Sequence, residues 1–306
     1  PTPHVTEGTY EEKLVSYGWT AMNATLVSEP TYTPTYEETL KSVNENLSYF
    51  DMSPKARHIE TADDIVEAKK KGQLGVILGV QSPSFIDQDR SRVRIMHKLG
   101  LRILQMTYME RNYLGDGCLE FENRGLTHFG VQIVRECNRV GIVLDCSHVG
   151  VNTTIDTAKY SSKPILIGHT ACRAIVDNPR AANDDQIRAV ADKGGVIGMT
   201  PLATLIRTDQ QPTVDDYVNH FDHVINLVGQ DHIGLGTDMF DGKTKVNWVT
   251  PIFYPEVSGK SSYSDFSQKS DLPNLVEAFL RKGYSRELIL KILGGNYMRV
   301  FREVWR

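Results

Sequence analysis

Two histidines each end a short apolar run of the sequence, where they could ligate a metal ion or transfer a proton. His148 follows the run GIVLDCS, and His169 follows PILIG. Such runs predict buried parallel strands, whose neighbouring carboxyl ends lie about 4.8 Å apart at one edge of a sheet. Imidazole nitrogens are favoured ligands of zinc. The pair therefore predicts a metal site, with zinc as the expected ion.

A further strand end supplies a carboxylate for the same site. Asp238 closes the run HIGLGTD and could act as a metal ligand, a general base, or an acid toward a leaving amine. Alternatively, it could only cap the following turn. A single histidine at a strand end is more often structural, but two histidines on consecutive strands with an aspartate across the sheet favour a catalytic role. Gln81, Tyr108 and Thr200 end three further runs.

Three side chains near these strand ends are candidates for binding a substrate. Arg180 lies in DNPRAANDD, just before a predicted helix. Its guanidinium could bind a substrate carboxylate through two parallel hydrogen bonds, or it could form an ion pair with Asp177 or Asp184. Tyr108 and Asn112, in TYMERNYLGDG, could contact substrate or be ordinary loop residues. Five other histidines are expected to be structural or exposed: His97, His128, His220, His223 and His232.

The elements that position these side chains alternate between strand and helix. Seven runs rich in Val, Ile and Leu begin at Trp19, Gly75, Arg102, Gly141, Pro164, Gly195 and His232. Strands that are apolar on both faces indicate a parallel sheet covered by helices, and a (β/α)₈ TIM barrel is the common closed form at this length. We expect the eighth strand at or before the amino terminus. A doubly wound open sheet is the alternative, but no GxGxxG turn supports it.

The helices and loops between these runs indicate one domain over residues 1–306. Thr61, Asn183 or Asp184, and Ser285 have the residue types that cap helix starts. The segment 241–272, rich in Ser, Lys, Tyr and Pro, predicts a long loop. On a barrel, such a loop lies over the catalytic face.

Composition and charge exclude several classes of partner. A net charge of −4 and a pI near 6.2 do not suit nucleic acid or an acidic membrane surface. No apolar run reaches the roughly 20 residues of a membrane span, and no leader opens the sequence, so a cytoplasmic location is expected. The cysteines form no CxxC pair and are expected to be reduced and mostly buried: Cys118, Cys137, Cys146 and Cys172.

Five segments of the chain resemble the renal or membrane dipeptidases, a family of binuclear zinc (β/α)₈ barrels that hydrolyse dipeptides. The segments are LDCSHVG, ILIGHT, the NPR of DNPRAANDD, GLGTD and GGNYMRVFREVW. The resemblance implies that His148 and His169 ligate the second metal and that Arg180 holds the substrate carboxylate. It also implies that Asp238 handles the proton during amide cleavage, and that the protein is a homodimer.

The chain departs from this family at the metal site. Gln81 stands where the family has a glutamate that bridges the two metals, and a neutral amide bridges two dications poorly. The family's first strand ends in a His-x-Asp pair for the other metal, and no such pair is visible in the sequence. Tyr108 stands where active members carry a substrate-contacting histidine. Together with Asn112 and the GDG at 115–117, it resembles a bacterial branch of the family.

Three functions are compatible with these residues. The first is a metal-dependent hydrolase of dipeptides or small N-acyl amino acids. The second is a barrel enzyme with one metal or none, in which Gln81, Tyr108 and Asn112 would bind an amino-acid-like or betaine-like carboxylate. The third is a binding barrel without catalysis.

Overall fold

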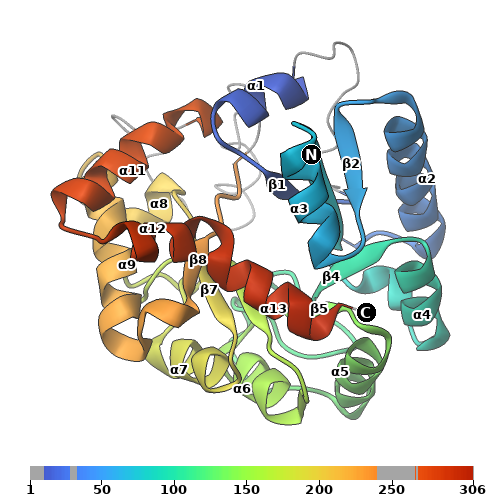
Figure 1. Ribbon diagram of the computed structural model, residues 1–306. Coiled ribbons are helices and arrows are strands. Elements are labelled where there is room, and N and C mark those ends of the chain that lie inside the picture. The colour runs from blue at the N-terminus through green and yellow to red at the C-terminus, as the bar shows by residue number, and fades with distance from the viewer. Residues whose placement is uncertain (1–9, 28–32, 240–265, 267, 306) are drawn as a thin grey trace.

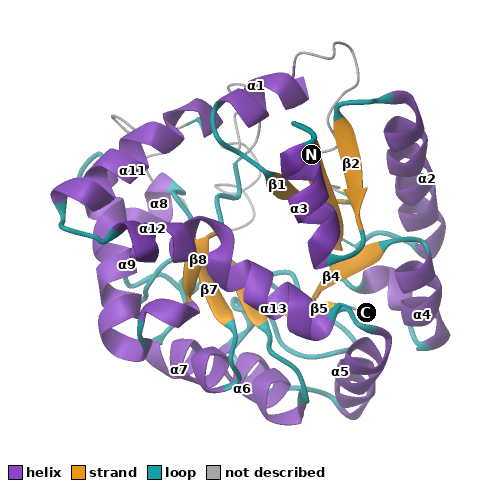
Figure 2. Cartoon of the chain, viewed as in Figure 1, coloured by secondary structure: helices purple, strands orange, loops and turns teal. Residues whose placement is uncertain are grey.

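The computed structural model describes residues 10–27, 33–239, 266 and 268–305 of the 306-residue chain. Its described strands form one parallel sheet that curls into a partly closed barrel, with helices on the outside (Figures 1 and 2). The strands are β1 (Ala21–Thr25), β2 (Ala56–Ile59), β3 (Leu74–Val80), β4 (Leu101–Gln105), β5 (Val143–Asp145), β6 (Leu166–Thr170), β7 (Val196–Met199) and β8 (Ile233–Leu235).

The strand order is β1-β3-β4-β5-β6-β7-β8, and β2 also pairs with β3. From β3 onward, neighbouring strands follow one another in the chain, which is the order of a (β/α)₈ barrel. A doubly wound sheet would instead reverse its order at a switch point. The predicted fold class is therefore confirmed. Between described residues no ladder joins β8 to β1, so the barrel is open at that side.

Helices surround the sheet. They are α1 (Tyr10–Ser16), α2 (Tyr36–Met52), α3 (Ala62–Lys70), α4 (Ser91–Lys98), α5 (His128–Val140), α6 (Val151–Tyr160), α7 (Asp184–Asp192), α8 (Ala203–Ile206), α9 (Val214–Val228), α11 (Leu272–Arg281), α12 (Arg286–Leu290) and α13 (Asn296–Val304). The predicted caps are confirmed for α3, α7 and α12, where Thr61, Asn183 and Ser285 accept backbone N–H groups.

The predicted position of the eighth strand was wrong. We expected that strand at or before the amino terminus, and it is β2, with the sequence ARHI. Its two central side chains are polar because they leave the core: Arg57 pairs with Asp64 at 2.7 Å, and His58 stacks on Phe50 with ring centroids 4.9 Å apart. Because of these two polar residues, β2 lacks the apolar run by which the other strands were predicted.

Helix α13 covers the amino-terminal end of the barrel, where it crosses in front of the strands in Figure 1. Its apolar residues Val300 and Phe301 pack in one cluster with Ile77 and Ile103, from β3 and β4. These side chains form the apolar part of the barrel interior at this end. The carboxyl ends of the strands remain for chemistry, as in other barrels.

Three other sequence predictions concern loops, cysteines and membrane spans. The expected loop at 241–272 lies mostly outside the described residues, and its described end is helical from Lys269 onward. All four cysteines are free, and three of them are buried. In the ranges that the structure describes, no helix has the length and apolarity to cross a membrane.

His220 is structural, as predicted, and it lies fully buried on α9. Its Nδ1 accepts from the backbone N–H of Cys172 at 3.0 Å, and its Nε2 lies 3.3 Å from the carbonyl of Ile206. Burial lowers the pKa of His220 to about 4. The unfolded chain takes up this proton below about pH 6.5 and the folded chain only below about pH 4. Folding stability therefore falls as the pH drops from 6.5 to 4.

We expect His220→Asn to remove this acid sensitivity. The asparagine Oδ1 can still accept from Cys172, but no imidazole is left to protonate. Between pH 6.5 and 4, the unfolding free energy should fall less steeply in the variant than in the wild type, by on the order of 3 kcal/mol. Urea unfolding at a series of pH values measures both slopes. Parallel curves would show that the His220 imidazole does not contribute to the acid sensitivity.

Candidate active site

The two predicted histidines meet at the carboxyl ends of β5 and β6. Their Nε2 atoms are 2.9 Å apart, and both side chains are buried, at 5% and 8% exposure for His148 and His169. Burial, followed by the nearby charge of Arg180, lowers the pKa of both imidazoles, in His169 to about 3. Both rings are therefore neutral at pH 7, the form that can ligate a metal or accept a proton.

A hydrogen-bond network through Asp145 and Ser147 positions these histidines. The Asp145 carboxylate accepts from the backbone and hydroxyl of Ser147, at 2.8 and 2.7 Å, and from the backbone N–H of Gly168 at 2.8 Å. The Ser147 hydroxyl in turn accepts from the backbone N–H of His169 at 2.9 Å. A Cβ on Gly168 would clash with the carboxylate of Asp145. Sequence reasoning missed both positioning residues, although they lie within three residues of His148.

The backbone is strained at two of the predicted catalytic residues. His148 has φ 60° and Asp238 has φ 49°, in the left-handed region that few residues other than glycine occupy, although His and Asp enter it more often than most. The carbonyl of His148 is held by the backbone N–H of Cys118 at 2.9 Å and by the Thr107 hydroxyl at 3.4 Å. Strain that the surroundings maintain in this way is typical of functional sites.

Asp238 faces the histidines from the end of β8. Its Oδ2 lies 3.8 Å from Nε2 of His169, and the Gln81 side chain is near enough to its carboxylate to lower the carboxyl pKa. Burial raises the pKa of the Asp238 carboxyl to about 6, although Arg180 and Gln81 favour the ionised form. A carboxyl with this pKa can accept and return a proton near neutral pH.

Arg180 is a buried cation beside this group. It is 5% exposed, and its Nη2 donates to the carbonyl of His169 at 3.0 Å. Neither alternative ion pair forms: Asp177 pairs with Arg173 at 3.3 Å, and Asp184 with His223 at 2.8 Å. Among described residues, no ion pair neutralises Arg180, so its charge is available to an anionic ligand.

The loop after β4 carries Tyr108 and Asn112, whose side chains make different contacts. The Tyr108 ring stacks on His148 with centroids 4.3 Å apart, so it lies at the site. The Asn112 amide donates to the carbonyl of Met106 at 3.0 Å and accepts from the N–H of Leu114 at 2.7 Å. Asn112 thus shapes the loop, the alternative that its sequence position allowed.

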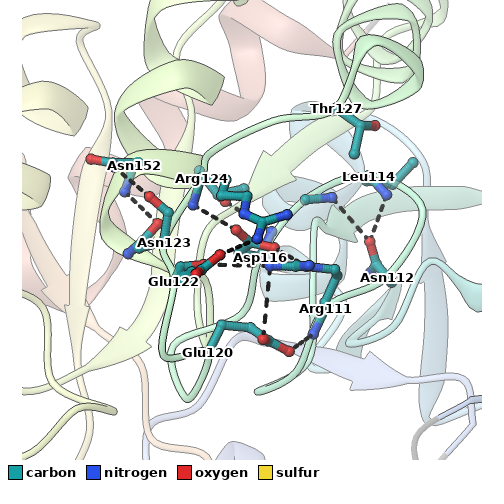
Figure 3. A network of polar contacts seen from close by, with 12 residues as sticks. Arg111, Asn112, Leu114, Asp116, Glu120, Glu122, Asn123, Arg124, Thr127 and Asn152 are labelled. Carbon is teal, nitrogen blue, oxygen red and sulfur yellow. Dashed lines mark hydrogen bonds and ion pairs between the residues drawn. The ribbon is translucent and has the colours of Figure 1, made fainter.

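A buried carboxylate holds this loop together (Figure 3). Asp116 is 3% exposed and accepts from Nε of Arg111 at 2.5 Å and from the backbone N–H of Arg124 at 2.6 Å. Its own N–H donates to the Thr153 hydroxyl on α6 at 3.0 Å. The sequence indicated only a turn at Asp116 and Gly117. The network fixes the loop to α6. It thereby also positions Tyr108, whose ring stacks on His148.

A cavity of about 580 Å³ opens beside His169, Asp145 and Asp238, and β1 contributes to its lining. Asn23 and Thr25 line it together with Gln81, His169 and Asp238. These two side chains end the first described strand with one residue between them, where the family resemblance led us to expect His-x-Asp. Sequence reasoning missed them because it placed that strand end at the edge of the chain.

The described residues fit one metal ion and not two. His148 and His169 direct two nitrogens to one point, and Nδ1 of His148 is buried without a hydrogen-bond partner among described residues. Within residues 10–27, 33–239, 266 and 268–305, however, no three His, Cys, Asp or Glu side chains form a metal-binding group. Two imidazoles can hold an ion whose other positions go to Asp238, solvent or substrate. Among the residues that the structure describes, none supplies charged ligands for a second ion.

Comparisons with known proteins agree with this architecture. Dipeptidase tcpJ of Claviceps purpurea (strain 20.1) is 31% identical over 246 residues, which cover 79% of this chain and 54% of that protein. This chain thus spans about half the length of that dipeptidase. The crystal structure of an amidohydrolase from Pseudomonas aeruginosa superposes with a TM-score of 0.87 at 30% identity, covering 98% of this chain and 93% of that one.

A metallo peptidase from Rhodobacter sphaeroides, liganded with a phosphinate mimic of the dipeptide L-Ala-D-Ala, shares the fold. Its TM-score is 0.78 at 21% identity, and the match covers 96% of this chain and 89% of that one. The family described as membrane dipeptidase (Peptidase family M19) matches residues 16–306. With the histidine pair, Asp238 and Arg180 arranged as described, the chain belongs to the membrane dipeptidase family.

Proposed function

We propose that this protein is a dipeptidase-like, metal-dependent hydrolase of dipeptides or small N-acyl amino acids. The observation that carries the proposal is the convergence of two neutral imidazoles with a carboxylate whose pKa is about 6. His148 and His169 would hold a zinc ion, which supplies Lewis-acid polarisation of a carbonyl when bound. The phosphinate dipeptide mimic bound by the Rhodobacter sphaeroides protein supports the substrate class.

The other residues would orient the substrate and move the proton. Arg180 would bind the substrate carboxylate, since it is a buried cation without an ion pair among described residues. Asp238 would accept a proton from the attacking water and deliver it to the leaving nitrogen. Tyr108, stacked on His148, would shield that imidazole from bulk water.

Metal removal tests the proposal. The protein, reconstituted with zinc, should cleave members of a panel of dipeptides and N-acyl amino acids. Dialysis against a chelator should lower the rate at least about 100-fold, because carbonyl polarisation contributes several kcal/mol. Adding zinc back should restore the rate. Absence of any cleavage by the reconstituted protein would contradict the proposed function.

The neutral residues on β1 and β3 favour a second candidate function. In this case the barrel acts on a small amino-acid-like carboxylate without a metal, and the histidine pair serves as acid and base. His148→Ala would then abolish a turnover that chelators leave unchanged.

The homodimer and the cytoplasmic location stay predictions. Light scattering of the purified protein measures the first.

A further inference from the structure

The cavity has two chemically different sides. Toward β5, β6 and β8 it presents His169, Asp145 and Asp238, and toward β1 and β3 its polar side chains are neutral. Asn23 and Thr25 point to the same face of β1 because side chains alternate along a strand.

Gly79 leaves space for the Asn23 side chain on the neutral side of the cavity. β1 and β3 are paired, with Thr25 opposite Gly79. A Cβ on Gly79 would clash with the Asn23 amide. The Asn23 side chain therefore lies across the β3 backbone, two residues before Gln81. The three neutral side chains are thus gathered at one corner of the cavity.

Gln81 already has partners that suit a site without a bridging metal. Its side chain lies near the Asp238 carboxylate and favours the ionised form, and its backbone carbonyl accepts from Nε2 of Gln105 at 2.5 Å. A glutamate at this position would place two carboxylates together, which favours an intervening cation. The amide instead favours the ionised form of Asp238 and brings no negative charge.

The charge of the cavity also opposes a second dication. Its described lining carries two carboxylates, Asp145 and Asp238, and two lysines, Lys69 and Lys269. These four charges balance, and the buried guanidinium of Arg180 beside Asp238 adds one positive charge. Two divalent ions would add four positive charges, and hydroxyl and amide groups bring no negative charge to balance them.

We propose that each chain binds one divalent metal ion, at His148 and His169, and that Asn23, Thr25 and Gln81 form a neutral hydrogen-bonding subsite where a second ion would otherwise lie. This inference rests on the proposed function, because it takes the histidine pair as a metal site. The subsite offers amide donors and carbonyl acceptors, the chemistry that recognises an uncharged amide group of a substrate.

Metal content tests this inference without reference to activity. Wild-type protein loaded with zinc, freed of excess ion and measured by inductively coupled plasma mass spectrometry, should contain one zinc per chain. The Asn23→Ala, Thr25→Ala, Gln81→Ala variant should also contain one, because these residues are not ligands. The Asn23→His, Thr25→Asp, Gln81→Glu variant should contain two, and His148→Ala none.

Several results would overturn the inference. These are two ions or none in the wild type, loss of the ion in the alanine variant, or a folded charged variant that still holds one. Thermal unfolding identifies a variant that fails to fold, and the wild-type and alanine measurements then decide. A wild type with one ion that cleaves no dipeptide or N-acyl amino acid would contradict the proposed function and leave the metal count intact.

Discussion

Replacing Asp238 with asparagine is expected to lower kcat for amide cleavage by about 10²- to 10⁴-fold, the usual contribution of a positioned general acid–base. Asparagine has nearly the shape of aspartate, and Gln81 can rotate its amide to bond with it. The fold should therefore survive. What the variant loses is a group that accepts a proton from water and returns it to the leaving nitrogen.

Initial rates with the best substrate of the panel, together with Tm and zinc content, measure this effect. Tm and zinc content should match the wild type, since His148 and His169 are unchanged and the asparagine Oδ1 keeps an oxygen donor at position 238. Gln105→Asn serves as a matched control, because Gln105 is a nearby buried amide that contacts the Gln81 carbonyl and not Asp238. An Asp238→Asn rate within about twofold of the wild type would exclude Asp238 as the proton carrier.

Arg180→Ala is expected to raise KM by about 10²- to 10³-fold for substrates with a free carboxylate. A hydrogen bond between two charged groups is worth more than a neutral one, and its loss inside a buried site leaves the substrate anion unpaired. Arg180→Lys keeps the charge without the planar pair of donors, so its KM should lie between those of the wild type and the alanine variant.

Substrate chemistry provides the control for Arg180. A dipeptide amide carries no carboxylate, so the wild type should bind it as weakly as Arg180→Ala binds the free acid, and the variant should show little further loss. Because Nη2 of Arg180 also donates to the His169 carbonyl, zinc content must be checked in each variant. Equal losses for acid and amide would show that Arg180 supports the site structurally and does not bind the carboxylate.

Much of the fold was predictable because its signals are local. A capped helix followed by an apolar strand appears in consecutive residues, as with the helix that Thr61 caps and the strand Leu74–Val80. Strand ends also gave the position of the site, since parallel strands bring His148, His169 and Asp238 to the same edge. β2 was not predicted because its two central residues are polar. Their partners, Asp64 and Phe50, lie outside the strand.

The sequence by itself determined the barrel, the strand-end histidines and the substitution at Gln81. Only the tertiary structure decided which residues share the site. In the structure, Arg180 has no ion pair among described residues. The Asn112 amide bonds within its own loop, and Asn23 lies beside β3. These outcomes depend on contacts between segments far apart in the chain. Spacing along the sequence identifies the side chains at a strand end, whereas their charge environment and partners arise from packing.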